Sequence, residues 1–388
     1  MHLPAAAGGR RKWGGGRLGK GKGIREVAFV NCSGGGQVVV ENNVAYVGNM
    51  RSPDGTTILD VSDPRNPREI SRLGMVPGAH SHKVRVANGL MLVNREFVSP
   101  QLSPSNFRGG LGIYDVSTPH KPKLICEWTT AGKGVHRFDF DGRFAYISAT
   151  EEGYVGHIMK ILDLASPAKP QEVGRWWIPG QWSAGGESQT WKGADHRIHH
   201  PLRLGNRLYT SCWLAGLRIL DIEDMSKPKV VSALSWSPPF PWPTHTALPV
   251  PFPVRGRRLM IVSDEDVART DDQPPSFLWM VDITDEHHPV PFGSFQVEAE
   301  DGSARPTFTG CHQPCEKITG TEIPVAWFAH GLRVIDFSNP HTPREVAWYE
   351  PTPSGGAARI QSNDVTVDDR GLIYLLDRVH GLHILERV

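Results

Sequence analysis

The sequence predicts an all-β protein, a seven-bladed β-propeller whose blades each contain four short strands. Three observations support this prediction. An apolar strand that ends in an acidic residue recurs along the chain, a proline-containing turn follows almost every copy, and 41 glycines and 32 prolines in 388 residues indicate many turns. Repetition of one supersecondary unit at this length is typical of a propeller rather than of separate domains.

The recurring strand is the clearest element of the repeat. Its first copy is TILDV, and later copies such as KILDL and RVIDF keep the apolar pattern and the acid. The acids are Asp60, Asp115, Asp163, Asp221, Asp282, Asp336 and, in the last copy, Glu386. They are about 48 to 61 residues apart, which suits four short strands with their turns. Because each aspartate precedes a proline-containing turn, we expect it to cap that turn rather than to catalyse a reaction.

The other strands of the unit are assigned around this acid. Two strands joined by a tight turn precede it, as in segment 78–96 with its Asn-Gly turn, and a fourth strand follows the prolines. The last unit stops at Val388 without a fourth strand, and segment 24–30, IREVAFV, has the pattern of the missing strand. We therefore expect the two ends of the chain to pair and to close the ring, which removes open sheet edges.

Residues 24–388 then form a single propeller domain, and residues 1–23, which are basic and rich in glycine, are expected to form a disordered tail. Repeats of the ILDVSDPRNP type resemble those of the LVIVD-repeat proteins, which are bacterial β-propellers mostly of unassigned function. The resemblance covers roughly residues 24–388. It implies the propeller fold and no particular activity.

Composition excludes several classes of partner. The net charge of +1 gives no reason to expect a nucleic acid or an anionic membrane, and no apolar run approaches the roughly 18 residues of a membrane-spanning helix. The N-terminal segment lacks the apolar region of a secretory signal. Five cysteines form an odd set without regular spacing, which favours reduced thiols in a cytoplasmic protein. The partner that we expect is a small-molecule substrate.

Histidine recurs at one position of the unit. When the first strands of the units are aligned on their apolar residues, five units place a histidine two residues before the same apolar position, and the other two place Gly36 and Asn363 there. The five are His82, His136, His200, His245 and His312. With 17 histidines in 388 residues, this recurrence is improbable by chance. Because the first strands of propeller blades surround the central axis, we expect the five imidazoles to form a ring.

A ring of imidazoles is a typical ligand set for a transition metal. Neutral imidazole suits Fe, Cu, Zn or Ni, and a site dominated by nitrogen disfavours Mg and Ca. The sequence therefore predicts a transition metal ion on the axis, with Fe favoured and Cu, Zn or Mn as alternatives. A polar channel whose histidines only form hydrogen bonds is the competing interpretation. Cys311 and Cys315 flank His312 in an order that differs from the C-x-x-C-H haem motif, so haem is rejected and a thiolate ligand is left open.

Carboxylates and further histidines fall at the same end of the blades. Acids near the ends of second strands are candidate general bases, or acceptors for the second N–H of a bound imidazole: Glu96, Glu151 and Glu265. His80 and His199 are candidate acids or bases beside the ring. His199 and His200 are adjacent, so either can be the inward residue. Long loops rich in Trp, Phe and Pro are expected to form an apolar cleft above the ring.

These observations favour a metalloenzyme, most of all an oxidoreductase or oxygenase that acts on a small apolar or aromatic substrate. An all-histidine site on a propeller is similar in architecture to that of the carotenoid-cleavage oxygenases, which hold non-haem iron with four histidines, although their sequence pattern is absent here. A Zn- or Mn-dependent lyase or hydrolase with a carboxylate base is the alternative. A binding or scaffold propeller without a metal is the second alternative.

Overall fold

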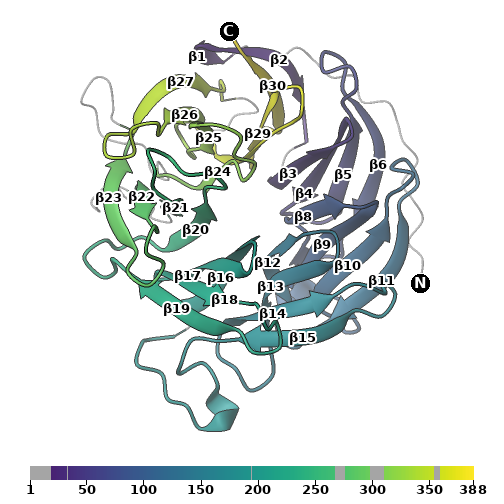
Figure 1. The fold of residues 1–388 in the computed structure, drawn as a ribbon. Helices are drawn as coiled ribbons and strands as arrows, with labels where there is room; N and C mark the ends of the chain where they lie inside the picture. The colour runs from purple at the N-terminus through teal and green to yellow at the C-terminus, as the bar shows by residue number, and fades with distance from the viewer. Residues whose placement is uncertain (1–18, 33, 194, 267–275, 298–309, 354–358) are drawn as a thin grey trace.

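The computed structural model describes residues 19–32, 34–193, 195–266, 276–297, 310–353 and 359–388. These residues form 30 β-strands and two 3-10 helices of three residues each, η1 (Pro100–Leu102) and η2 (Ser183–Gly185). Figure 1 shows the sheets standing around a central axis, so the predicted all-β propeller architecture is confirmed. Within the described ranges, no helix has the length and apolar character needed to cross a membrane.

Strands that are consecutive in the chain pair antiparallel in the first three sheets. The first sheet consists of β3 (Gly35–Glu41), β4 (Val44–Asn49), β5 (Asp54–Asp60) and β6 (Arg68–Gly74). The second consists of β7 (Ala79–His80), β8 (Val84–Ala87), β9 (Leu90–Phe97), β10 (Gly110–Asp115) and β11 (Lys123–Thr129). The third consists of β12 (Val135–Phe140), β13 (Phe144–Thr150), β14 (His157–Asp163) and β15 (Gln171–Trp176).

An eight-stranded sheet follows, and its two halves are joined by the single pair Trp213↔Thr244. One half consists of β16 (His196–Leu204), β17 (Arg207–Trp213), β18 (Leu217–Asp221) and β19 (Lys229–Leu234). The other consists of β20 (Thr244–Pro249), β21 (Leu259–Asp264), β22 (Leu278–Asp282) and β23 (Val290–Phe295).

The last two sheets each take one strand from the beginning of the chain. One combines β1 (Lys20–Lys22) with β24 (Gln313–Pro314), β25 (Glu322–Ala326), β26 (Leu332–Asp336) and β27 (Arg344–Glu350). The other combines β2 (Ile24–Val30) with β28 (Ser362–Val367), β29 (Ile373–Asp377) and β30 (Leu382–Arg387). The pairing of β2 with β30 is the ring closure that the sequence predicts, and the two strands lie side by side in Figure 1.

The predicted end of the N-terminal tail, at residue 23, is wrong. Residues 20–22 form β1, which pairs with β27 in the register Lys20↔Glu350, and the Gly19 backbone N–H donates to the Tyr349 hydroxyl at 3.1 Å. The cause is the open edge of β27, whose unpaired backbone groups accept a further strand. Residues 1–18, the rest of the expected tail, lie outside the described residues.

The inner strands line the axis in a closed cycle. In this cycle β3 contacts β8, and each later inner strand contacts the next until β28 returns to β3; the remaining members are β12, β16, β20 and β24. Apolar side chains fill the space between neighbouring sheets, as where Tyr46 and Ile58 pack against Val84 and Met91. Packing between sheets therefore holds the inner strands around the axis, with their first residues at one end.

The repeated aspartates have the structural role that their position in the repeat predicts. Asp60 Oδ1 accepts a hydrogen bond from the Ser62 backbone N–H at 3.0 Å and from the Ser62 hydroxyl at 2.6 Å. The equivalent carboxylates accept from the backbone N–H two residues later: Asp115, Asp163, Asp221, Asp282 and Asp336. Each acid caps the turn that carries the prolines, so none of them is needed to explain the chemistry of the axis.

We predict that ring closure contributes measurably to stability. Val30 of β2 is fully buried against β30 and β29, so Val30→Ala should lower the free energy of unfolding by about 2 kcal/mol. Val388→Ala is the matched control, because Val388 at the other end of the chain is 73% exposed. Urea unfolding measures both variants, and an equal change in the two would contradict a contribution from ring closure.

Candidate metal centre

An extra residue at the start of the inner strands creates the site. In β12 the pairing with β13 shifts between Val135 and Arg137, so His136 is an extra residue with no partner across the sheet. The same shift falls on Gly36, His245 and Asn363, and in β16 it falls between His196 and His200. Such a bulge bends the strand and re-aims side chains. As a result, two consecutive residues of an inner strand can both reach the axis.

Six imidazoles form a continuous series along this end of the axis, called here the histidine arc. Its members in order are His80, His82, His136, His199, His245 and His312. The centroids of neighbouring rings are between 4.0 and 5.1 Å apart. The structure thus brings together four of the five predicted ring histidines, and it adds His80 and His199.

His200 is the predicted ring residue that the structure places elsewhere. His200 pairs with Ser211 across β17, as Arg137 pairs with Ser148 across β13, so His199 and not His200 is equivalent to His136. The alignment fails by one residue because it matches Leu202 to Phe138, whereas Pro201 has the equivalent pairing across the sheet. Leu202 lines a cavity on the axis.

The centre of the arc is a close pair of imidazole nitrogens. His136 Nδ1 lies 2.8 Å from Glu96 Oε2, and His199 Nδ1 lies 2.8 Å from the backbone oxygen of His245. Both acceptors lack a hydrogen, so both Nδ1 atoms donate and both Nε2 atoms carry a lone pair. These two Nε2 atoms are only 3.2 Å apart. Two lone pairs repel each other at this distance, and a shared cation removes the repulsion.

The other members of the arc differ in the lone pairs that they offer. His312 Nδ1 donates to the backbone oxygen of Asn363 at 2.5 Å, which leaves its Nε2 lone pair open. His245 Nε2 instead accepts from the Arg137 guanidinium at 3.1 Å. His82 Nδ1 accepts from the Asn94 amide at 3.2 Å, so its proton is on Nε2. By this count His136, His199 and His312 present open Nε2 atoms, and His80, whose Nε2 donates to Glu96, keeps its lone pair on Nδ1.

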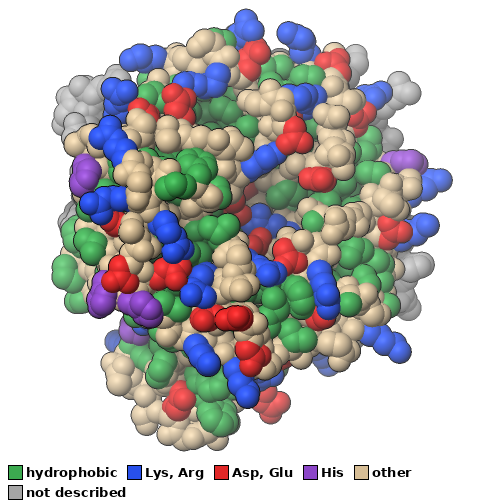
Figure 2. Space-filling view, in the orientation of Figure 1, with side chains coloured by type: hydrophobic (Ala, Val, Ile, Leu, Met, Phe, Trp, Pro, Cys, Tyr) green, Lys and Arg blue, Asp and Glu red, His purple; other side chains and the backbone are tan. Residues whose placement is uncertain are grey.

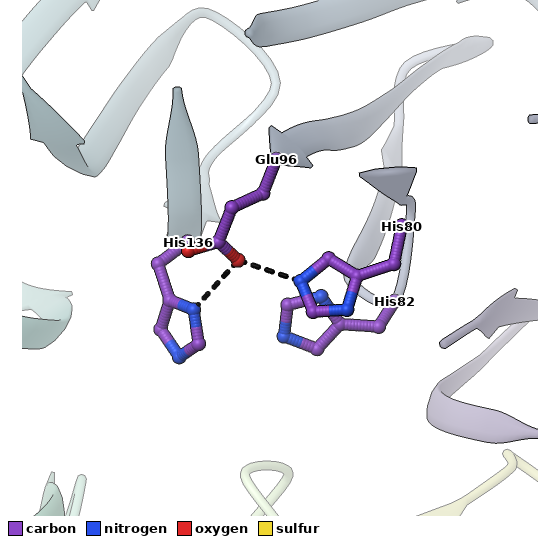
Figure 3. Close-up of side chains that lie close together, drawn as sticks. All are labelled: His80, His82, Glu96 and His136. Carbon is purple, nitrogen blue, oxygen red and sulfur yellow. Dashed lines mark hydrogen bonds and ion pairs between the residues drawn. The ribbon is translucent and has the colours of Figure 1, made fainter. Parts of the chain in front are cut away.

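Glu96 is the acid that holds one side of the arc. Its Oε2 accepts from His80 Nε2 at 2.7 Å and from His136 Nδ1 at 2.8 Å, as Figure 3 shows. Burial alone would raise the pKa of Glu96, but the electrostatic interaction with His136 and the hydrogen bonds from the imidazoles hold it well below its usual range. Glu96 therefore lies where the sequence predicts an acceptor for the second N–H of a bound imidazole.

His157 is a further buried histidine near the arc, outside the residues that the sequence singles out. It is buried at the start of β14, and its Nε2 lies 3.6 Å from Glu96 Oε1. Neither of its ring nitrogens has a hydrogen-bond partner in the described structure. No signal in the repeat could have found it, because His157 comes from a third strand rather than from an inner strand.

The two other predicted acids have different environments. Glu265 is buried, with its oxygens 3.6 Å from His312 Nε2 and 3.9 Å from His245 Nε2. Glu151, by contrast, pairs with Lys160 of β14, which also contacts Glu172 of the outer strand β15 at 3.1 Å. The expectation that Glu151 serves the site is therefore wrong, because a buried cation between blades draws its carboxylate away from the axis.

A second layer of polar side chains lies directly beyond the arc. Its members follow the arc positions by one residue in each inner strand: Gln37, Lys83, Arg137, His200, Thr246, Gln313 and Asp364. All seven are at most 3% exposed. His200 Nε2 here faces Arg85 at 3.5 Å and Glu316 at 3.6 Å, and Arg137 bonds to Glu316 at 3.1 Å. This layer is an ion-paired channel lining, which is the competing interpretation that the sequence left open for the histidines.

The cavities and loops differ from the predicted apolar cleft. A cavity of about 340 Å³ lies at the far end of the axis, lined partly by Arg85, Asp139 and Leu202. Figure 2 shows charged side chains of both signs around the hollow at the centre of the face in view. The aromatic residues of the loop after β15 pack on one another instead, with Trp177 and Trp182 at a centroid distance of 5.6 Å.

Burial keeps five of the six imidazoles of the arc uncharged, as the following pKa values show. Burial lowers the pKa of His136 to about 4, against the opposing charge of Glu96. It lowers well below the usual range the pKa values of His82, His199, His245 and His312. Burial also raises the pKa of Cys315 to about 12 and that of Cys311 well above its usual value, and both thiols pack in an apolar core. Neutral imidazoles are competent metal ligands, whereas these protonated thiols are not.

Two groups in this region have donor atoms close enough together to hold a metal ion. His80, His82, Glu96 and His136 form one group, and His199, His245 and Glu265 form the other, with the donor atoms of each group within 4.8 Å of one another. The pair His136–His199 joins the two groups. Two nitrogen ligands about 2.1 Å from a tetrahedral ion are about 3.4 Å apart, close to the separation observed.

Comparison with known proteins supports the β-propeller fold, whereas the chemistry has to be inferred from the residues of the site. The family model of the LVIVD repeat matches residues 35–73 and 324–350. No curated protein matches the chain. Among solved structures, the Cps50 (Swd1) β-propeller domain of Myceliophteria thermophila is similar at 12% identity and a TM-score of 0.60, over 93% of this chain and 99% of that one. The C-terminal WD40 domain of Sif2 is similar at 10% identity and 0.56, over 96% and 99%.

We predict a pH dependence of stability from the neutral arc. The pKa of His136 is about 4 in the folded protein and near 6.5 when unfolded, so the unfolded chain binds the extra proton between these values. The metal-free protein should therefore lose stability as the pH falls from about 6.5 to 4, by about 1.4 kcal/mol per pH unit for each such histidine. His136→Gln should make this fall shallower, whereas the exposed His288→Gln should not. Equal slopes in chemical unfolding of all three proteins would contradict the prediction.

Proposed function

Because the chain is an LVIVD-repeat β-propeller, its function must come from groups that this scaffold brings together, and we propose that these make it a metal-dependent enzyme. In this proposal a transition metal ion lies between His136 and His199 on the propeller axis. We also propose that the ring has seven four-stranded blades, with the eight-stranded sheet divided at the pair Trp213↔Thr244.

The observation that carries the proposal is the pair of Nε2 atoms 3.2 Å apart. Each imidazole donates a hydrogen bond from its one N–H to a fixed acceptor, which is Glu96 for His136 and a backbone carbonyl for His199. No proton is then left between the two nitrogens at neutral pH, because burial depresses both pKa values. A metal-bound histidine usually donates its other N–H to a carboxylate or a carbonyl, as both of these residues do.

The donor set favours a redox metal, with Fe ahead of Cu, Zn and Mn. Glu265 lies in one group with His199, and two imidazoles with one carboxylate are typical of mononuclear non-haem iron sites. Such an ion would supply the electrons that an oxidoreductase needs, together with coordination positions that protein ligands do not occupy. The chain's own groups hold the imidazoles in one tautomer, through Glu96, and surround the site with the side chains of Trp213 and Phe328. A small apolar or aromatic substrate suits these walls.

One observation favours the alternative of a Zn- or Mn-dependent lyase or hydrolase. Burial raises the pKa of Glu265, against the charges of Arg378, Lys83 and Arg197. A buried carboxylate with a raised pKa is suited to proton transfer. Glu96 is less suited to this role, because it already accepts from two imidazoles. A scaffold without a metal, as expected of many propellers, would instead leave the lone-pair contact of His136 and His199 unexplained.

Metal analysis of purified protein tests the proposal. The wild type should retain about one equivalent of a transition metal, and His199→Gln should lose it. His200→Gln is the matched control, because His200 faces Arg85 and Glu316 rather than the arc, and it should retain the metal. A wild type that holds no metal and is not stabilised by Fe, Cu, Zn or Mn would contradict the proposal. If iron or copper is found, O₂ consumption with aromatic or olefinic compounds tests the redox reaction.

The role of Glu96 gives a separate prediction. Glu96→Gln removes the charge that fixes His136 and His80, so metal affinity should fall about 10- to 100-fold while the fold is kept. Glu152→Gln changes an exposed carboxylate outside the histidine arc and should leave the affinity unchanged. Competition with a chromophoric chelator measures both. Wild-type affinity in Glu96→Gln would show that this carboxylate does not support a ligand.

A further inference from the structure

Two arginines lie at the open side of the histidine arc, and from them we infer that the substrate carries a carboxylate. Arg197 comes from the inner strand β16, and Arg378 follows β29. The inference rests on the proposed function, because it places the reacting part of the substrate beside the metal. It goes further in assigning the substrate to the small apolar or aromatic acids, with the carboxylate bound by the two guanidinium groups.

Arg197 lies over an aromatic ring that itself contacts the arc. Its guanidinium carbon is 4.1 Å from the centroid of Trp213, and Trp213 is 5.0 Å from His199. Among the described residues, no carboxylate lies within ion-pair distance of Arg197, although Glu96 and Glu265 are near enough to act on its pKa. Stacking on an indole leaves the N–H edge of a guanidinium available to a planar anion.

Arg378 has the same arrangement on the other side. Its guanidinium carbon is 4.9 Å from the centroid of Phe328, and Phe328 stacks on His312 at 4.5 Å. Arg378 Nε donates to Asn363 Oδ1 at 2.5 Å, which fixes the side chain, and its terminal nitrogen is 3.6 Å from Glu265. The side chain remains 25% exposed, as is 21% of His136, so this side of the arc is open to solvent.

These two aromatic residues are held in a strained backbone conformation. Trp213 and Phe328 have φ values of +56° and +24°, a region that bulky residues rarely adopt. Each lies in a turn of the same kind, in which the backbone N–H of the preceding residue donates to a glycine carbonyl. These hydrogen bonds run from Cys212 to Gly216 and from Trp327 to Gly331. Such strain is found mainly at functional sites. Here it positions the two rings that carry the guanidiniums and contact the arc.

Charge balance points to the same ligand. Neutral imidazoles do not offset a divalent cation. Glu96, Glu265 and Asp195 act on the pKa of Arg197, and Glu265 and Asp377 act on that of Arg378. A bound metal ion would add positive charge beside the two guanidinium groups, which favours an anionic substrate. A carboxylate matches a guanidinium with two parallel hydrogen bonds, and an aromatic or aliphatic body matches the walls formed by Trp213 and Phe328.

Titration with benzoate, measured by calorimetry on metal-free and metal-loaded protein, tests the inference. Benzoate should bind the wild type, and benzamide, which has the same shape without the charge, should bind at least tenfold more weakly. Arg197→Gln, Arg378→Gln and the double variant should each weaken benzoate about tenfold or more and leave benzamide unchanged. Arg344→Gln, at a residue 76% exposed on an outer strand, is the control and should bind as the wild type does.

The results separate this inference from the proposed function. Because Arg197 has no ion pair to lose, Arg197→Gln should fold normally even if Arg378→Gln does not, and Arg378→Lys keeps the charge as a second variant. Equal affinity for benzoate and benzamide, or unchanged benzoate affinity in Arg197→Gln, would overturn the carboxylate assignment, whatever the metal content. Benzoate binding that depends on the two arginines in a protein that takes up no metal would support the anion site and overturn the metal proposal.

Discussion

The structure depends on one constraint, the extra residue near the start of the inner strands. Without it, alternate residues of β12 would face the axis, and His136 and Arg137 could not both reach it. With it, the first layer collects imidazoles and the next layer collects ion-paired and amide side chains. The propeller repeats this irregularity around the axis, so a local departure from strand geometry becomes a concentrated polar site.

That polar site has a definite protonation pattern because the surrounding acceptors are fixed. A carboxylate accepts a hydrogen bond from Nδ1–H of His136, and backbone carbonyls accept hydrogen bonds from Nδ1–H of His199 and of His312. The Nε2 lone pairs therefore point into the site, and burial keeps the imidazoles neutral. Buried lone pairs that face one another are unfavourable when no cation lies between them. A bound cation, as proposed, therefore explains the arrangement better than a simple channel lining does.

Much of the fold could be predicted from the repeat, because each unit has the same physical requirements. The aspartate that caps the proline turn and the pairing of β2 with β30 follow from patterns visible in the chain. The site was harder to predict. An apolar anchor gave His200 in place of His199, since Pro201 and not Leu202 has the pairing equivalent to that of Phe138. Glu151 and His157 depend on Lys160 and Glu96, which are contacts between side chains that no spacing reveals.

Anomalous diffraction at the absorption edge of a bound transition metal tests the central claim most directly. The account predicts one strong peak on the axis, about 2.1 Å from the Nε2 atoms of both His136 and His199, with the Nδ1 hydrogen bonds to Glu96 and to the His245 carbonyl retained. A peak beside His200 and Glu316, or none between the two Nε2 atoms in metal-loaded crystals, would contradict it.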